Sequence, residues 1–155
     1  MRKLDPLDVA LLAELKKDGS ISNKNLSKKL EVPATTCLER VRRLHQDGFI
    51  NGIHADINYK ALGLGLQAMA VIRLKLHPRK VIEQFEKEIL DYPEVISLYH
   101  IGGENDFLVH LCVRDSDHLR EFSFSAFTDR EEVAHLETLL VFETKRSQTF
   151  PLLQD

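Results

Sequence analysis

Cysteine is scarce in this chain, which contains only two among its 155 residues. Cys37 and Cys112 lie in separate segments, and neither belongs to a CxxC or CxxH pattern. This spacing argues against a disulfide framework and against a zinc finger. Both cysteines alternate with apolar residues in periodic segments, so we expect them to be buried as small apolar side chains.

Long hydrophobic runs are also missing. No apolar stretch approaches the roughly 20 residues that a membrane-spanning helix needs. The first 15 residues lack the apolar centre of a signal peptide because Asp5, Asp8 and Glu14 interrupt them. These absences predict a cytoplasmic protein with no membrane partner. A composition of 43% hydrophobic and 29% charged residues favours packed domains over long disorder.

The chain contains no P-loop, dinucleotide fingerprint or nucleophile elbow, and its histidines are not spaced as metal ligands. His100 and His110 can approach one another across a hairpin, but two imidazoles make only half a metal site. We therefore expect no catalytic residues, no metal and no cofactor. An enzyme built on the C-terminal half is the remaining alternative of that class, because a fold alone does not exclude one.

The net charge of −3 lacks the positive excess typical of nucleic-acid binders. The sign is uneven, however. Residues 1–48 contain 10 Lys or Arg against 7 Asp or Glu, whereas residues 49–155 contain 11 against 17. Because association with DNA depends on a local basic patch, the N-terminal third remains a candidate for it. So small an excess indicates that one copy binds weakly, so we expect binding to need at least a dimer.

Residues 22–48 have the pattern of two short helices interrupted at Glu31-Val32-Pro33. Ser22 is suited to cap the first helix, and Pro33 can occupy the first turn of the second, where its missing N–H is no loss. Such a pair is the helix-turn-helix shape that enters a DNA major groove.

A helix over about residues 4–17 is expected to precede that pair, with Asp8 as the one polar interruption of its apolar stripe. Gly19 is suited to end this helix in a left-handed cap. Residues 49–57 alternate briefly and predict the strand or hairpin of a winged helix. The N-terminal domain is therefore expected to span residues 1–60.

Beyond residue 60 the periodicity changes. The pattern predicts strand 66–76, a helix between Pro78 and Pro93, strands 95–101 and 107–113, a second helix after Asp115, and strand 135–145. The order β-α-β-β-α-β is that of the ferredoxin-like fold. The sequence thus predicts an α+β protein with a winged helix-turn-helix over residues 1–60 and a ferredoxin-like domain over residues 61–155.

With both halves in view, the chain resembles the Lrp/AsnC family, the feast/famine transcription regulators. The matching segments are LDPLDVALLAEL, LSKKLEVPATTCLERVRRLHQDGFI, Ala61-Leu62-Gly63, IGGENDFLVHLCV and VAHLETLLVFE. The resemblance implies a DNA-binding domain followed by an amino-acid-binding regulatory domain. It also implies homodimers paired through their sheets, assembly into octamers or larger oligomers, and effectors bound between dimers. Asn105 departs from the family, whose members often have an aromatic residue there.

The helix after Pro33 supplies most of the candidate DNA contacts. Cys37, Val41 and Leu44 recur on one side and predict the core-facing stripe. The polar residues around the rest of that helix, together with those at the start of the preceding helix, are the candidates for contact with double-stranded DNA: Ser22, Asn23, Lys24, Thr35, Thr36, Glu39, Arg40, Arg42 and Arg43. The plain alternative is a solvated helix face with surface ion pairs.

The loop Gly102-Gly103-Glu104-Asn105-Asp106 is the candidate effector site. Its glycines allow close backbone approach, so their N–H groups can hold a carboxylate, while Glu104 or Asp106 can meet an ammonium group. These two needs describe a free amino acid. Thr128 and Thr138 are the polar residues expected on the other side of such a site. An ordinary tight connection between two strands is the alternative.

The sequence thus predicts a sequence-specific transcriptional regulator whose DNA binding or assembly responds to an amino-acid effector. The alternative is a nucleoid-associated architectural protein that binds DNA with low sequence specificity. The sequence leaves open the effector, the target genes, the DNA site, the oligomer number, and whether the effect is repression or activation.

Overall fold

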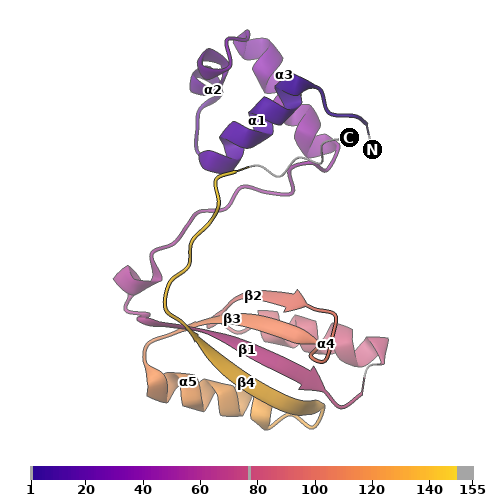
Figure 1. The fold of residues 1–155 in the computed structure, drawn as a ribbon, viewed down its shortest axis with the longest axis vertical. Helices are drawn as coiled ribbons and strands as arrows, with labels where there is room; N and C mark the ends of the chain where they lie inside the picture. Colours follow the sequence, from indigo (N-terminus) through magenta and orange to yellow (C-terminus); the bar gives the residue numbers. More distant parts are fainter. Residues whose placement is uncertain (1, 77, 150–155) are drawn as a thin grey trace. The chain divides into compact units, whose positions relative to one another are not determined.

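The computed structural model describes residues 2–76 and 78–149, which divide into two compact units. One unit contains the described residues up to Asp56 together with those from Lys145 onward. The other unit is Ile57–Thr144. The first unit is helical and the second is built on a sheet (Figure 1).

The N-terminal unit is a three-helix domain that closes over a small apolar core. Its helices are α1 (Pro6–Lys17), α2 (Asn23–Lys29) and α3 (Ala34–Gln46). The buried core side chains come from all three helices: Leu11, Leu12, Leu26, Cys37 and Leu44. Partly buried Val41, Phe49 and Ile50 pack against them. The predicted core-facing stripe of α3 is therefore confirmed.

Side-chain caps explain where the first two helices begin. Asp5 caps α1 through a capping box with Asp8, in which each carboxylate accepts a hydrogen bond from the other residue's backbone N–H. The Ser22 hydroxyl accepts from the Asn25 N–H at 3.2 Å, as the sequence predicts. Pro33 is the N-cap of α3, one residue before the first-turn position predicted for it.

The prediction of a left-handed Gly19 cap is wrong, because Asp18 caps α1 in an extended conformation and Gly19 does not have a positive φ. A different constraint explains the glycine. A Cβ atom at position 19 would lie 2.6 Å from Cγ2 of Ile53, so a larger residue would force the Ile53 side chain to shift. Gly48, by contrast, follows α3 with a φ of 76°, a left-handed conformation that suits glycine after the end of a helix.

The strand predicted over residues 49–57 does not form in the structure. Residues 50–58 contain no regular element, and Ile53 and Ile57 are about half exposed. A strand needs a hydrogen-bonded neighbour, and an alternating pattern in one segment does not supply it.

The C-terminal unit is a four-stranded antiparallel sheet with two helices. After a short 3-10 turn at Tyr59–Leu62 come β1 (Leu66–Leu74), α4 (Arg79–Leu90), β2 (Val95–His100), β3 (Phe107–Val113), α5 (Ser116–Ser123) and β4 (Val133–Val141). A π turn at Phe124–Thr128 continues α5. The strand order β2-β3-β1-β4 and this element order confirm the ferredoxin-like prediction.

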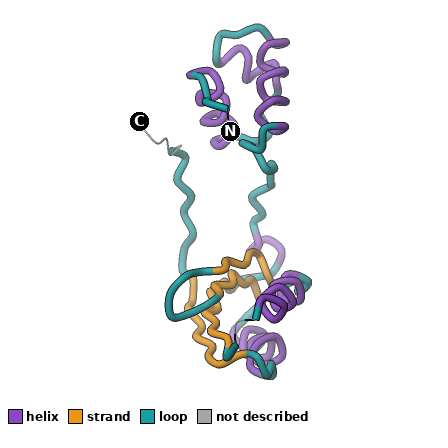
Figure 2. Tube along the Cα trace, turned by 90° about the vertical axis from the view of Figure 1, so that its right-hand side faces the viewer, coloured by secondary structure: helices purple, strands orange, loops and turns teal. Residues whose placement is uncertain are grey.

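Both helices cover the same face of the sheet (Figure 2). The core lies between these layers and includes Ile72 of β1, Phe85 of α4, Phe107 of β3 and Phe127 of the π turn. Phe85 and Phe107 stack with ring centroids 4.9 Å apart. Among residues 57–76 and 78–144, no α-helix covers the other face of the sheet.

The strand register shows which residues belong to that open face. Val71 of β1 pairs with Leu108 of β3 and with Glu137 of β4, so these side chains share one face. By the same register Thr138 stands opposite Ala70, on the helix-covered face. Within residues 2–76 and 78–149, no helix is long and apolar enough to cross a membrane.

Candidate functional site

The outward side of α3 presents a continuous set of exposed residues. Three of the predicted DNA contacts belong to it, and so do two residues that were not predicted as contacts, one apolar and one polar. These exposed residues are Thr35, Leu38, Glu39, Arg42 and Gln46. We call them the recognition face. Leu38 is 49% exposed, which is unexpected for a leucine adjacent to the buried Cys37.

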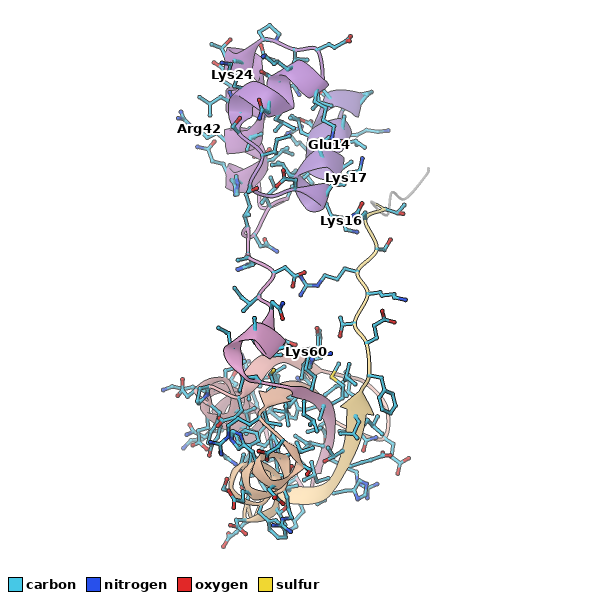
Figure 3. The ribbon with its side chains drawn as sticks, turned by 90° about the vertical axis from the view of Figure 1, so that its left-hand side faces the viewer. Glu14, Lys16, Lys17, Lys24, Arg42 and Lys60 are labelled. Atoms are coloured by element: carbon cyan, nitrogen blue, oxygen red, sulfur yellow. The ribbon has the colours of Figure 1, made fainter. Side chains whose placement is uncertain are left out.

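Arg42 is the cation of the recognition face, and its side chain is exposed. Neither Arg42 nor Lys24 takes part in an ion pair or side-chain hydrogen bond with another described residue. Figure 3 shows both on one side of the helical unit, whereas Glu14 and Lys17, which pair with one another at 2.8 Å, lie on the other. Two cations on this side are therefore available to a polyanion.

Arg43 and Thr36 flank the recognition face. The Arg43 side chain is 58% exposed and lies 3.7 Å from a carboxylate oxygen of Asp47, one helical turn away. Such an exposed pair contributes little and is easily exchanged for a phosphate. Thr36 is half-buried. Of the two, Arg43 is the more accessible to a ligand.

Arg40 does not belong to the recognition face, contrary to its predicted exposure. Its guanidinium pairs with Asp5 and, at 3.1 Å, with Oδ1 of Asp8. Arg2 pairs with the other oxygen of Asp8 and, at 2.6 Å, with Asp47. We call Arg2, Asp5, Asp8, Arg40 and Asp47 the ion cluster. Arg40 thus joins α3 to the start of α1.

Asp8 is the centre of the ion cluster and is completely buried. The hydrogen bond from Arg2 is the largest cause that lowers the pKa of Asp8, from 3.8 to about 2. The Asp5 backbone and Arg40 act in the same direction, and burial opposes them. The Asp8 carboxylate is therefore ionised at neutral pH and balances two guanidinium groups.

Of the three residues predicted at the start of α2, two make hydrogen bonds that hold the fold and one has a side chain that remains available for contact. The Asn23 amide donates to the Ala34 carbonyl at 2.9 Å and so ties the start of α2 to the first turn of α3. The Ser22 hydroxyl is used by the cap of α2, although the residue is exposed. Lys24 has no such intramolecular role among the described residues.

The glycine loop 102–106 joins β2 to β3. Gly103 has a φ of 127°, a conformation that residues with a side chain rarely adopt, and the tips at Gly102 and Glu104 are exposed. The Glu104 carboxylate accepts from Arg73 of β1 at 2.9 Å. Asn105 is half-buried. The loop therefore offers exposed backbone N–H groups beside one carboxylate that is paired with a surface arginine.

Asp106 is built into the sheet rather than presented at the loop tip. Its carboxylate accepts from the backbone N–H of Leu74 at 2.7 Å, and its own N–H donates to the Ile72 carbonyl at 2.8 Å. These bonds hold the start of β3 against β1, where the pairing of β1 with β4 shifts register. Asp106 thus has a structural role in addition to any contact with an effector.

Thr128 and Thr138 are both exposed, and Thr138 lies apart from the loop. Thr128 ends the π turn, and its hydroxyl donates to the Ser123 carbonyl at 3.3 Å. Thr138 lies on β4, and β1 separates β4 from β3, which follows the loop. With strands about 4.8 Å apart, an effector that touched both the loop and Thr138 would have to reach across β1.

Comparison with known proteins identifies both units. Residues 4–51 match the model of a winged helix-turn-helix DNA-binding domain, and residues 67–150 match that of the Lrp/AsnC ligand binding domain. The chain belongs to the Lrp/AsnC family. The family's members are DNA-binding transcriptional regulators with a ligand-binding domain.

Individual relatives agree with this assignment. The chain is 37% identical over 145 residues to the HTH-type transcriptional regulator AldR of Mycolicibacterium smegmatis, covering 94% of this chain and 85% of that one. It is 32% identical over 138 residues to the leucine-responsive regulatory protein of Rhizobium meliloti, and the match covers 89% of this chain and 88% of that protein. A transcriptional regulator of Neisseria meningitidis, solved as its L-Met complex, has the same fold, with a TM-score of 0.86 and 24% sequence identity. The superposition covers 96% of this chain and 97% of that one.

The Lrp/AsnC models cover the three helices and the sheet described above, so the recognition face lies in the DNA-binding domain and the glycine loop in the ligand-binding domain. Within the described residues, no group of three or more His, Cys, Asp and Glu side chains is arranged to hold a metal ion.

Several residues of these sites were not predicted as site residues, and three of them differ in the signal that the sequence offered. Asp8 could have been recognised from the sequence, because a carboxylate that interrupts an apolar helical stripe needs a partner when it is buried. Arg73 also left a signal, since it lies on the polar side of the alternating strand 66–76. Leu38 left none, because helical spacing alone does not distinguish a leucine at the edge of a core from one beyond it.

Proposed function

We propose that this regulator binds specific DNA sequences through the recognition face. Thr35 and Glu39, near the start of α3, are placed to contact base edges, as in other helix-turn-helix proteins. Arg42 is suited to a guanine edge or a phosphate, and Arg43 and Lys24 to phosphates. The observation that carries the proposal is the exposure of Arg42 on this helix, together with its lack of an ion-pair partner among residues 2–76 and 78–149.

Three predicted contacts have indirect roles in this proposal. Asn23 sets the placement of α2 against α3, and Ser22 caps α2, so both act on DNA binding through the geometry of the helix pair. Arg40 acts through the ion cluster and is not proposed as a direct contact. Thr36, being half-buried, is a candidate for a backbone contact to phosphate rather than for reading a base.

We propose further that the protein acts as a homodimer or a larger oligomer such as an octamer. The open face of the sheet supports this, because it exposes large apolar side chains that water disfavours, among them Tyr99 at 51% and Leu139 at 46%. A few cations in one domain bind DNA weakly, whereas linked copies make each further contact effectively intramolecular. Assembly therefore supplies the affinity that one copy lacks.

The proposed effector is an amino acid bound at the glycine loop. Its carboxylate would accept from the N–H groups of Gly102 and Gly103, and its ammonium group would meet the exposed Glu104. The L-Met complex of the Neisseria regulator supports this class of ligand. An effector that binds one assembly or conformation better than another must change DNA occupancy by linkage.

Arg42→Ala tests the proposed interface. Fluorescence anisotropy would be measured against a duplex selected from a random DNA pool and against its scrambled version, at several salt concentrations. We expect Arg42→Ala to weaken binding about tenfold for each bound protomer and to lower the salt slope by about one for each. Arg79→Ala is the matched control, because Arg79 is 91% exposed on α4 and pairs only with Glu83 among the described residues.

The outcomes separate the proposal from its alternatives. Wild-type affinity in Arg42→Ala at every salt concentration would show that this face does not meet DNA. Equal binding to selected and scrambled duplexes would favour an architectural protein of low specificity. An absence of binding even at low salt would contradict the proposed interface altogether.

The effector proposal has its own test. Each of the common amino acids would be added to the protein–DNA complex, and the change in DNA affinity recorded. We expect one or a few to shift it, and Glu104→Gln to remove that shift while leaving effector-free DNA binding unchanged. A response of equal size in Glu104→Gln would exclude the carboxylate as the ammonium partner.

A further inference from the structure

Leu38 is an exposed apolar side chain at the edge of the otherwise polar recognition face. On a helix, residues three and four apart are neighbours, so Leu38 lies beside Thr35 on one side and Arg42 on the other. Its 49% exposure shows that the core of the unit does not need it, since Cys37, Val41 and Leu44 supply the core-facing stripe of α3. A single exposed leucine is ordinary on a protein surface and needs no explanation. Leu38 needs one because it lies among the residues proposed to contact DNA.

The chemistry of the major groove limits what Leu38 can contact there. The base edges present hydrogen-bond donors and acceptors, with one apolar group among them, the C5-methyl of thymine. A leucine pressed against a guanine oxygen or a cytosine amino group would remove water from that polar atom without replacing its hydrogen bond, which is unfavourable. Against a thymine methyl, the same side chain buries apolar surface on both partners.

We propose that Leu38 contacts the C5-methyl group of a thymine and makes the protein prefer thymine at one position of each half-site. This inference rests on the proposed DNA-binding role of the recognition face. Leu38 is thus a residue that determines specificity, while Arg42 beside it supplies charge. The preference is independent of salt, because no ion is displaced by an apolar contact.

Replacing single thymines by deoxyuridine tests this inference, since that change removes the methyl group and leaves every hydrogen-bonding group in place. The duplex is first selected from a random pool with the wild-type protein, and each thymine is then replaced in turn. We expect one replacement per half-site to weaken wild-type binding about fourfold, the value for burying one methyl group. The other replacements should have little effect.

Variants of the side chain assign the effect to Leu38. Leu38→Ala should bind the thymine and deoxyuridine duplexes equally, whereas Leu38→Met, which keeps an apolar side chain of similar size, should retain the discrimination. Leu90→Ala is the control, because Leu90 is 56% exposed at the end of α4, outside the DNA-binding domain. It should behave as wild type. Circular dichroism confirms that each variant is folded.

Three results would overturn the inference. One is a wild-type protein that is indifferent to every deoxyuridine replacement. Another is a deoxyuridine penalty that persists in Leu38→Ala. The third is a change of sedimentation in Leu38→Ala with its thymine discrimination intact, which would place Leu38 against a second copy of the chain. If the wild type prefers no duplex from the pool, the proposed function itself fails, and this outcome differs from the other three.

Discussion

Asp8→Asn is the substitution that tests the ion cluster most directly. The change keeps the size of the side chain and leaves an oxygen able to accept from the Asp5 N–H, as Asp8 does in the capping box. It removes the negative charge that faces Arg2 and Arg40. Two guanidinium groups would then meet at a neutral amide in a completely buried position.

The expected loss follows from the pKa of Asp8. One pKa unit corresponds to about 1.36 kcal/mol, so a pKa lowered from 3.8 to about 2 corresponds to roughly 2 to 3 kcal/mol. Removing one partner of a buried ion pair typically costs about 3 to 5 kcal/mol. We therefore expect Asp8→Asn to lower the free energy of unfolding of the N-terminal unit by about 3 kcal/mol at pH 7. The total free energy of unfolding of a small domain is about 5 to 15 kcal/mol, so this loss would be a large part of it.

The stabilisation by Asp8 should depend on pH in a definite direction. Because the pKa of Asp8 is lowered in the folded state, its contribution is fully present above the ordinary value of 3.8 and is lost as the pH falls toward about 2. The difference in unfolding free energy between wild type and Asp8→Asn should therefore be constant from pH 7 to about 5. Below pH 4 it should become smaller.

Urea denaturation followed by circular dichroism would measure the loss, and hydrogen-exchange mass spectrometry would assign it to peptides of α1 and α3. Asp56→Asn is the matched control, because Asp56 is in the same unit, is 80% exposed and lies 3.7 Å from Arg146. It should change stability by less than about 0.5 kcal/mol. A loss below about 1 kcal/mol in Asp8→Asn, or a difference that does not shrink below pH 4, would refute the reasoning.

Two further predictions concern the glycine loop. Asp106→Ala should lower the free energy of unfolding by about 1 to 3 kcal/mol and speed hydrogen exchange of the Leu74 amide, because that buried N–H loses its acceptor. Glu104→Ala, at the exposed tip of the loop, is the control and should have little effect on stability. Equal stability of the two variants would contradict this prediction. Gly103→Ala should cost about 1 to 3 kcal/mol in thermal denaturation because of its positive φ, whereas Gly102→Ala, with open space around it and no such φ, should cost less than about 0.5 kcal/mol. A similar cost at both glycines would show that backbone conformation is not the cause.

Periodicity was sufficient to predict the helices, the four strands of the sheet and the buried side of α3, although it also predicted a strand over residues 49–57 that does not form. The spacing of Cys37, Val41 and Leu44 identifies the inner side of α3, and the element order β-α-β-β-α-β identifies the ferredoxin-like unit. Both follow from short-range patterns, because burial repeats every 3.6 residues in a helix and every 2 in a strand. The ends of elements are less determined, so β4 runs over Val133–Val141 instead of 135–145.

Contacts between distant residues could not be predicted in the same way. Arg40 has the spacing of an exposed cation, and only its three-dimensional neighbours Asp5 and Asp8, more than 30 positions away, show that it is paired. Asp106 has the composition of a loop tip, yet its partner is the Leu74 backbone. Long-range polar contacts depend on how elements pack, and one sequence contains little information on that.

The arrangement of α3 has a consequence for how such regulators diversify. Residues that hold the domain together, such as Cys37, Arg40 and Leu44, lie on one side of the helix, and Thr35, Leu38 and Arg42 lie on the other. Changes on the outer side can therefore accumulate without unfolding the domain. A library randomised at the outer positions alone should yield folded proteins with new DNA preferences, so the helix is a ready template for retargeting.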